Sequence, residues 1–186
     1  SDQNAFKWYL LAAEQGHADA QVWVGLFYTD GRHVPRNHVE AGKWYRKAAD
    51  EGNAKAQYML AQAYTKGVGV SKDYKVSLKG YRRASEQKHS SAQLGLGLMY
   101  ATGRGVEQNF ETAAQWYRRA AENGLAAAQY AMGAVYSLGK GLPKNYQKAA
   151  HWYGKAAEQN DVDAQLALGA MYRKGEGVHQ NHSKAL

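Results

Sequence analysis

A 36-residue period runs through the chain and constrains its fold more than any other feature. The aromatic pair Trp8-Tyr9 returns as Trp44-Tyr45, Trp116-Tyr117 and Trp152-Tyr153, and the same step places Gly80-Tyr81 in the third copy. An Ala-Gln pair and a further tyrosine keep this spacing, without insertion or deletion, in five copies that cover residues 5–184. A fixed period of this length indicates a stacked repeat architecture.

Each copy contains two apolar faces with helical spacing. In the second copy, Ala41 and Trp44 begin a face whose members recur at i, i+3, i+4, i+7 and i+8, which predicts a helix over about residues 38–51. A second face begins at Ala56 and ends before Gly67. Such a helix pair cannot bury its apolar faces alone, so neighbouring copies must stack and share one core.

Residues at the predicted helix ends agree with this reading. Gly52 stands where a left-handed residue closes the first helix. The position before the first helix carries, in register, a side chain that caps a helix N-terminus in Asn37, Asp73, Asn109, Asn145 and Asn181. The chain 1–186 is therefore expected to form a single array, with copies at about 5–40, 41–76, 77–112, 113–148 and 149–184 and the start of a sixth at 185–186.

The recurring pattern resembles a known repeat family. It reads A-x-x-W-Y-x-x-A-A-E-x-G, then A-Q-x-x-L-G-x-x-Y-x-x-G-x-G-V, and is similar to the Sel1-like repeats, which are relatives of the tetratricopeptide repeats. The stretch from Ala113 to Leu142 departs from it only at Met132 and Leu142. The resemblance covers essentially the whole chain and implies an all-α fold, a right-handed α-solenoid of five 36-residue helix-turn-helix repeats.

The third copy is the irregular one. It has Ser77, Gly80, Ser85 and Lys88 where the other copies mostly have Ala, Trp, Ala and Gly. A missing tryptophan side chain leaves a cavity costing roughly 3–5 kcal/mol unless neighbours close over it. Two outcomes follow: the neighbours repack, or a notch remains beside Gly80.

Composition and spacing exclude several kinds of chemistry. The chain has no cysteine, so it forms no disulfide and offers no thiolate nucleophile or zinc ligand. Polar residues recur with the repeat and do not converge on one point, so we expect no catalytic residue and no enzyme activity. The pairs His33 and His38, and His179 and His182, lack the further ligands that zinc requires, so we expect neither a metal site nor a cofactor.

The formal net charge of +8 raises the question of acidic partners. Stacked copies would align a basic ladder on the first helices, formed by Arg46-Lys47, Arg82-Arg83, Arg118-Arg119 and Lys155. Acidic residues four positions after the first arginines are placed to neutralise part of it. We interpret the ladder as a solvated face, with an acidic protein or lipid surface and nucleic acid as alternatives. Base-stacking aromatics are not interleaved with it, which argues against nucleic acid.

A partner is expected on the face formed by the second helices. The second helix is similar to the helix that lines the groove in tetratricopeptide repeats, and that register gives the candidate positions. The predicted groove residues are Val22, Leu26, Lys55, Tyr58, Gln62, Leu94, Leu98, Ala101, Tyr130, Ser137, Leu166 and Arg173, with Ala127 and Ala134 between them. For each single member, burial in the core between copies is the competing interpretation.

These observations favour a non-catalytic scaffold or adaptor that binds a peptide or helix of another protein in its concave groove. The alternative is an envelope protein that binds peptidoglycan or another glycan. The roles of bacterial Sel1-like proteins favour a periplasmic or secreted location over the cytoplasm. No transmembrane run is present, and Ser1 together with the partial helix at residues 183–186 leads us to expect further sequence at both ends.

Overall fold

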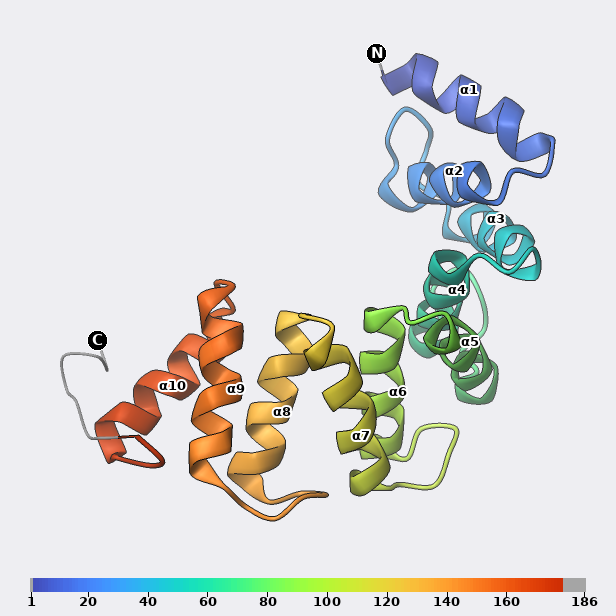
Figure 1. Cartoon of the computed structure of the whole chain (residues 1–186). Helices are drawn as coiled ribbons and strands as arrows, with labels where there is room; N and C mark the ends of the chain where they lie inside the picture. The colour runs from blue at the N-terminus through green and yellow to red at the C-terminus, as the bar shows by residue number, and fades with distance from the viewer. Residues whose placement is uncertain (1, 179–186) are drawn as a thin grey trace. The chain divides into compact units, whose positions relative to one another are not determined.

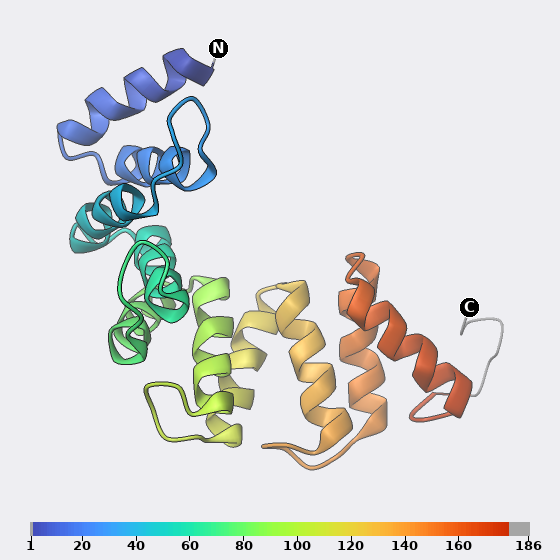
Figure 2. The same ribbon diagram turned by 180° about the vertical axis from the view of Figure 1, so that it is seen from behind.

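The computed structural model describes residues 2–178, in which all regular structure is helical (Figures 1 and 2). Ten helices of 13 residues alternate with short connections in this part of the chain. They are α1 (Asp2–Glu14), α2 (Ala18–Asp30), α3 (His38–Asp50), α4 (Ala54–Lys66), α5 (Tyr74–Glu86), α6 (Ser90–Thr102), α7 (Phe110–Glu122), α8 (Ala126–Leu138), α9 (Tyr146–Glu158) and α10 (Val162–Lys174). The predicted all-α helical repeat fold is confirmed.

The chain divides into two compact units, Ser1–Ala92 and Gln93–Leu186. In the first unit, consecutive helices pack against each other from α1 through to α5. In the second unit, α7 to α10 do the same around a continuous core that includes Ala120, Met132 and Ala156. The division of the whole chain into one array of repeats stays a prediction.

The helix ends follow the predicted start and stop signals. The side-chain oxygen of Asn37 accepts a hydrogen bond from the Glu40 backbone N–H at 3.0 Å, and that of Asn109 accepts one from Thr112 at 2.8 Å. Gly67 ends α4 in the left-handed conformation, with φ +72°. Asn181 and the start of a sixth copy lie outside the described residues.

Glycines in the second helix of a copy make room for the tyrosine that follows in the next helix. A Cβ atom added to Gly25 would lie 2.5 Å from the Tyr45 ring, and one added to Gly133 would lie 2.5 Å from the Tyr153 ring. Ordinary carbon contacts begin about 1 Å farther out. The Gly-to-Tyr contact therefore sets how closely successive helices approach, and it explains why both residues recur with the period.

The recurring Ala-Gln pair also has a structural role. The Gln57 side-chain N–H donates to the Ala49 carbonyl at 3.3 Å, and Gln129 donates to Ala121 in the same way at 3.2 Å. Each Oε1 accepts a hydrogen bond from a residue 30 positions on, Gln87 at 3.0 Å and Gln159 at 2.7 Å respectively. These buried amides thus join helices within one copy and link it to the next.

Between residues 2 and 178, three residues other than glycine adopt positive φ, and each stands at a position where the repeat favours glycine. They are His33 (φ 58°), Lys88 (φ 61°) and Asn160 (φ 64°). The backbone of the repeat is therefore maintained in these copies even where its preferred residue is missing.

Candidate functional site

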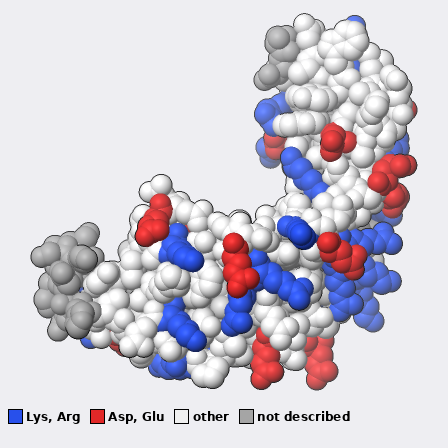
Figure 3. Space-filling model, viewed as in Figure 1, with Lys and Arg blue, Asp and Glu red and all other residues white. Residues whose placement is uncertain are grey.

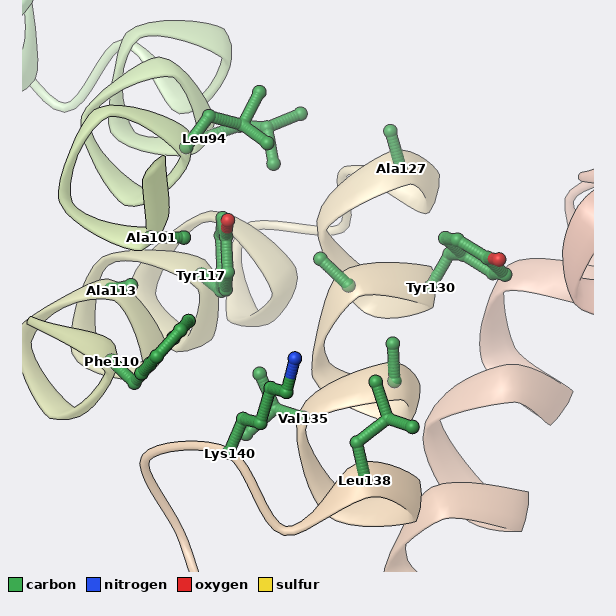
Figure 4. A pocket seen from close by; sticks show the side chains of 13 residues that line it. Leu94, Ala101, Phe110, Ala113, Tyr117, Ala127, Tyr130, Val135, Leu138 and Lys140 are labelled. Atoms are coloured by element: carbon green, nitrogen blue, oxygen red, sulfur yellow. The ribbon is translucent and has the colours of Figure 1, made fainter. Parts of the chain in front are cut away.

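An almost wholly apolar cavity in the second unit is lined by α6, α7 and α8 (Figure 4). Its volume is about 410 Å³. Aliphatic and aromatic side chains form almost all of its wall: Leu94, Leu98, Ala101, Phe110, Ala113, Tyr117, Ala127, Tyr130, Ala131, Ala134, Val135 and Leu138, with Lys140 at one end. We call this cavity the α6–α8 pocket.

The repeat itself places these side chains around one space. On α6, Leu94, Leu98 and Ala101 follow one another at helical spacing and share one face. Gly97, on the same helix, lets Tyr117 of α7 come close, since an added Cβ would lie 2.3 Å from its ring. The pocket is thus formed mainly by helical residues of the third and fourth copies.

Two leucines at the pocket remain open to solvent. Leu98 is 52% exposed and Leu138 is 64% exposed. Lys140 supplies the one cationic side chain of the lining, and its Nζ lies 5.6 Å from the centre of the Phe110 ring. A contiguous exposed apolar surface of this kind is typical of sites where another molecule binds.

The hydroxyl of Tyr117 is the unusual polar group of the site. In other copies the equivalent tyrosine pairs with a Thr or Ser of the preceding helix, as Tyr45 does with Thr29 at 2.8 Å. Ala101 occupies that position here, and in the described part of the chain no side chain hydrogen-bonds to the Tyr117 hydroxyl. Burial raises the pKa of Tyr117 to about 12, so the hydroxyl is protonated at neutral pH and able to donate.

Figure 4 shows how Tyr117 lies in the pocket. Its side chain stands between α6 and α8, with the hydroxyl oxygen on the side where Leu94 and Ala127 are found. Tyr117 is only 6% exposed. Because the hydroxyl oxygen is not among the buried unpartnered atoms of the described residues, it is open to solvent at the pocket and able to donate to a bound group.

The structure brings together the predicted groove residues of the third and fourth copies. Leu94, Leu98, Ala101 and Tyr130 all line the α6–α8 pocket, as do Ala127 and Ala134. Ser137 instead hydrogen-bonds to Tyr153, away from the pocket lining.

The predicted residues of the first two copies are placed differently. Val22 is 3% exposed and belongs to a core cluster on which Leu26 packs, so it offers no surface to a partner. Tyr58 stacks on His89 with ring centres 4.9 Å apart and accepts a hydrogen bond from Gln62 at 3.0 Å. Lys55 is exposed, with its Nζ 5.2 Å from the centre of the Trp23 ring.

The last two predicted residues, Leu166 and Arg173, lie on α10 and are exposed. Leu166 is 70% exposed but does not line the α6–α8 pocket. It therefore serves as a matched apolar surface residue against which the pocket leucines can be compared.

Sequence reasoning missed seven residues of the pocket lining: Phe110, Ala113, Tyr117, Ala131, Val135, Leu138 and Lys140. Tyr117 belongs to the recurring Trp-Tyr pair, which the groove prediction did not include. The signal that distinguishes it was present in the sequence, because Ala101 stands where the neighbouring copies have Thr or Ser.

Most cations of the basic ladder contact aromatic side chains of the same chain. Lys47, Arg119 and Lys155 lie over the rings of Trp44, Trp116 and Trp152, at 4.2, 4.6 and 5.0 Å from the ring centres. Arg46 and Arg118 donate hydrogen bonds to the hydroxyls of Tyr64 and Tyr136. These contacts bind the cations to aromatic neighbours. The predicted partial neutralisation by acidic residues four positions on stays a prediction.

Other candidate chemistry finds no support among residues 2–178. No three His, Asp or Glu side chains there come close enough to hold a metal ion, and no helix there has the length and apolar character needed to cross a membrane. His33 is exposed and His38 half-buried. His179 and His182 lie outside the described residues.

A second cavity, of about 260 Å³, lies beside Gly80 in the first unit. It is lined by α3, α4 and α5, and the residues around it include Arg46, Leu60 and Arg83. We call it the Gly80 pocket.

Comparison with known proteins agrees with the repeat period. The Sel1 repeat model matches residues 1–17, 18–53, 54–89, 90–125, 126–161 and 162–186. Each full match joins the second helix of one copy to the first helix of the next, whereas the copies defined above begin with the first helix. No match was found among curated proteins.

Solved structures with the same fold come from several bacteria. A protective antigen of uropathogenic Escherichia coli is 39% identical, with a TM-score of 0.91; the match covers 97% of this chain and 39% of that one. A Sel1 repeat protein from Oxalobacter formigenes is 39% identical, with a TM-score of 0.87 and coverage of 91% and 69%. One from Klebsiella pneumoniae, at 22% identity and a TM-score of 0.66, shares the fold.

Sel1 repeat proteins are generally non-catalytic scaffolds for protein interactions. The present chain spans about two fifths of the length of the Escherichia coli protein, which has the highest TM-score of the three structures described. Repeat matches that run from residue 1 to residue 186, together with these structures, confirm the resemblance seen in the sequence. The chain belongs to the Sel1 repeat family.

Proposed function

We propose that this chain is a non-catalytic interaction module that binds an amphipathic segment of another protein in the α6–α8 pocket. The observation that carries the proposal is an apolar cavity of about 410 Å³ with two exposed leucines and, from Tyr117, one tyrosine hydroxyl that has no side-chain partner. Its size falls within the range of about 300–1,000 Å³ that is common for ligand sites.

The chemistry of the lining favours an apolar protein segment over other ligands. A sugar would bury several hydroxyl groups against a wall whose polar side-chain groups are those of Tyr117, Tyr130 and Lys140, and unpaired buried hydroxyls are costly. A nucleic acid needs several cations for its phosphates, and this lining has one. An amphipathic helix or strand meets the site with two or three apolar anchors.

Tyr117 gives the bound segment a fixed polar contact. Its hydroxyl is expected to hydrogen-bond to a backbone carbonyl or side-chain oxygen of the segment, as Tyr45 does to Thr29 within the chain. Such a bond contributes about 0.5–1.5 kcal/mol, and it fixes the position of the segment along the groove.

The test uses the full chain and a library of random 12-residue peptides displayed on phage, roughly the length of one protein helix. Peptides are selected on the wild-type protein after removal of those that bind Leu98→Asn/Leu138→Asn. Selected sequences should place apolar residues at i, i+3 or i+4, and i+7. In fluorescence anisotropy, their affinity for the double variant should fall at least about tenfold, or 1.4 kcal/mol.

The matched control is Val162→Asn/Leu166→Asn. It replaces two exposed aliphatic side chains outside the pocket, which are 65% and 70% exposed. Peptide affinity should stay unchanged in it. Failure to enrich pocket-dependent peptides, or equal loss in both double variants, would refute the proposal.

Tyr117→Phe and Ala101→Thr test the hydroxyl separately. Tyr117→Phe should weaken peptide binding without lowering the stability of the free protein, because the hydroxyl has no partner to lose. Ala101→Thr should supply the partner that Thr29 gives Tyr45, so that the protein becomes more stable and binds the peptide less tightly. Unchanged affinity in both variants would remove the hydroxyl from the proposed contact.

A further inference from the structure

The third copy lacks a tryptophan but keeps the cation that accompanies it. In the second, fourth and fifth copies, Lys47, Arg119 and Lys155 each lie over the tryptophan three positions earlier, within 4.2 to 5.0 Å of the ring centre. The corresponding cation of the third copy is Arg83, and the position three residues earlier is Gly80. Arg83 therefore has no ring of its own copy to cover.

The space of the missing side chain remains open. Trp44 packs in a cluster with Ala13 and Val24 in the first two copies. One period later these neighbours become Ala49 and Leu60, and both line the Gly80 pocket of about 260 Å³. The Gly80 pocket is thus the position that a tryptophan occupies elsewhere in the chain.

The neighbouring helices cannot close this space by moving closer. A Cβ atom added to Gly80 would lie 2.9 Å from the Ala61 Cβ and 3.2 Å from the Gln57 carbonyl oxygen, so α5 already touches α4 at this point. Ala61 itself replaces the glycine that the repeat has at this position in most copies. Close packing of the backbones at Gly80 thus coexists with a cavity beside it.

The rim of the Gly80 pocket is mainly basic. Arg46, Lys79 and Arg83 line it against a single carboxylate, that of Asp50. Figure 3 shows Lys and Arg side chains gathered on the part of the first unit where α5 lies. Leu60 and Ala61 contribute apolar surface to the same lining. An occupant must therefore combine an apolar ring with negative charge.

We propose that the Gly80 pocket binds an aromatic side chain, best a tryptophan, from an acidic segment of a partner protein. The ring would lie under Arg83, as Trp116 lies under Arg119, and flanking carboxylates would face Arg46 and Lys79. This contact is separate from the α6–α8 pocket and does not depend on the function proposed for it.

The probe is a blocked Glu-Trp-Glu tripeptide that carries 5-fluorotryptophan, and its fluorine NMR signal is free of background because the unlabelled protein contains no fluorine. Titration with the full chain should shift and broaden this signal. A blocked Lys-Trp-Lys peptide should bind at least about tenfold more weakly, because it loses the charge complementarity. A blocked Glu-Ala-Glu peptide should fail to compete with the fluorinated probe.

Two variants and one control test whether the probe binds in the Gly80 pocket. Ala61→Gly/Gly80→Trp restores the residues of a regular copy and fills the pocket from within, so it should fold and lose probe binding. Arg83→Gln should lower the affinity at least about fivefold. Lys75→Gln, which removes an exposed cation of the same helix outside the lining, should leave it unchanged.

Each contrary result overturns the proposal. These are equal competition by Glu-Ala-Glu, unaltered binding in a folded Ala61→Gly/Gly80→Trp variant, equal losses in Arg83→Gln and Lys75→Gln, and no binding by the wild type at millimolar probe. If the double variant does not fold, as judged by circular dichroism, the comparison of Arg83→Gln with Lys75→Gln decides.

Discussion

The contact between Gly133 and Tyr153 can be tested with two substitutions of the same kind. Gly133→Ala and Gly154→Ala both replace a glycine inside a helix by alanine, which favours helix formation by about 1 kcal/mol. The new Cβ at residue 154 meets nothing within 4 Å, whereas that at residue 133 lies 2.5–2.8 Å from three ring atoms of Tyr153. The two variants share the propensity gain and differ in the steric cost.

Overpacking of a filled core costs about 1–3 kcal/mol. The Tyr153 ring is only 7% exposed, and a shift of about 1 Å is needed to restore normal contact, so the upper half of that range is expected. Gly154→Ala should therefore stabilise the protein by about 1 kcal/mol, and Gly133→Ala should destabilise it by about 1–2 kcal/mol.

Urea unfolding followed by circular dichroism measures both variants under the same conditions, with the slope of the transition as a check that its extent is unchanged. If Gly133→Ala proves as stable as Gly154→Ala, the glycine is not needed for the approach of α8 to α9. The explanation given for the recurrence of the Gly and Tyr positions would then be wrong.

Three further outcomes are expected. Gln21 Oε1 is a buried atom without a hydrogen-bond partner. In later copies a glutamine 30 positions on donates to the equivalent oxygen, as Gln87 and Gln159 do, but that position is Glu51 in this case. Glu51→Gln should therefore stabilise the protein by about 1 kcal/mol in urea unfolding. Lys88→Gly should relieve its left-handed backbone and stabilise the protein by about 1 kcal/mol, with a smaller gain for Asn160→Gly, since asparagine tolerates that conformation. Burial raises the pKa of Tyr45 and of Tyr153 to about 12, above the ordinary value of 10.0. The unfolded chain therefore loses these protons at lower pH than the folded protein, and the free energy of unfolding should fall between pH 10 and 12. Formation of tyrosinate, seen by absorbance, without a change in the free energy of unfolding would contradict this.

The sequence sufficed to predict the helices because their signals are local. The spacing of Ala41 and Trp44, the cap at Asn37 and the stop at Gly67 act within one helix and its ends, and the period multiplies each signal by five copies. The structure confirms these helices within its described residues, with α3 at His38–Asp50.

The pocket was only partly predictable, because its members are decided by contacts between copies. Leu98 and Val22 both belong to the predicted groove, yet Leu98 is 52% exposed and Val22 is 3% exposed. The difference depends on what packs against each residue from neighbouring helices, and helical periodicity does not encode that. Tyr117 was missed for a related reason: its motif is structural in every copy, and only the absence of a partner at Ala101 sets it apart.

Ala101 also has a consequence for the mechanics of the array. Stacked repeats unfold as a row of coupled units, and each junction transmits stability from one unit to the next in proportion to its own strength. The junction of α6 with α7 lacks the hydroxyl pair that joins α2 to α3. We therefore expect partial unfolding to stop at this junction, so that backbone amides on its two sides differ in protection from hydrogen exchange. A bound segment that hydrogen-bonds to Tyr117 would add the absent coupling, so ligand binding should make the unfolding of the second unit more cooperative.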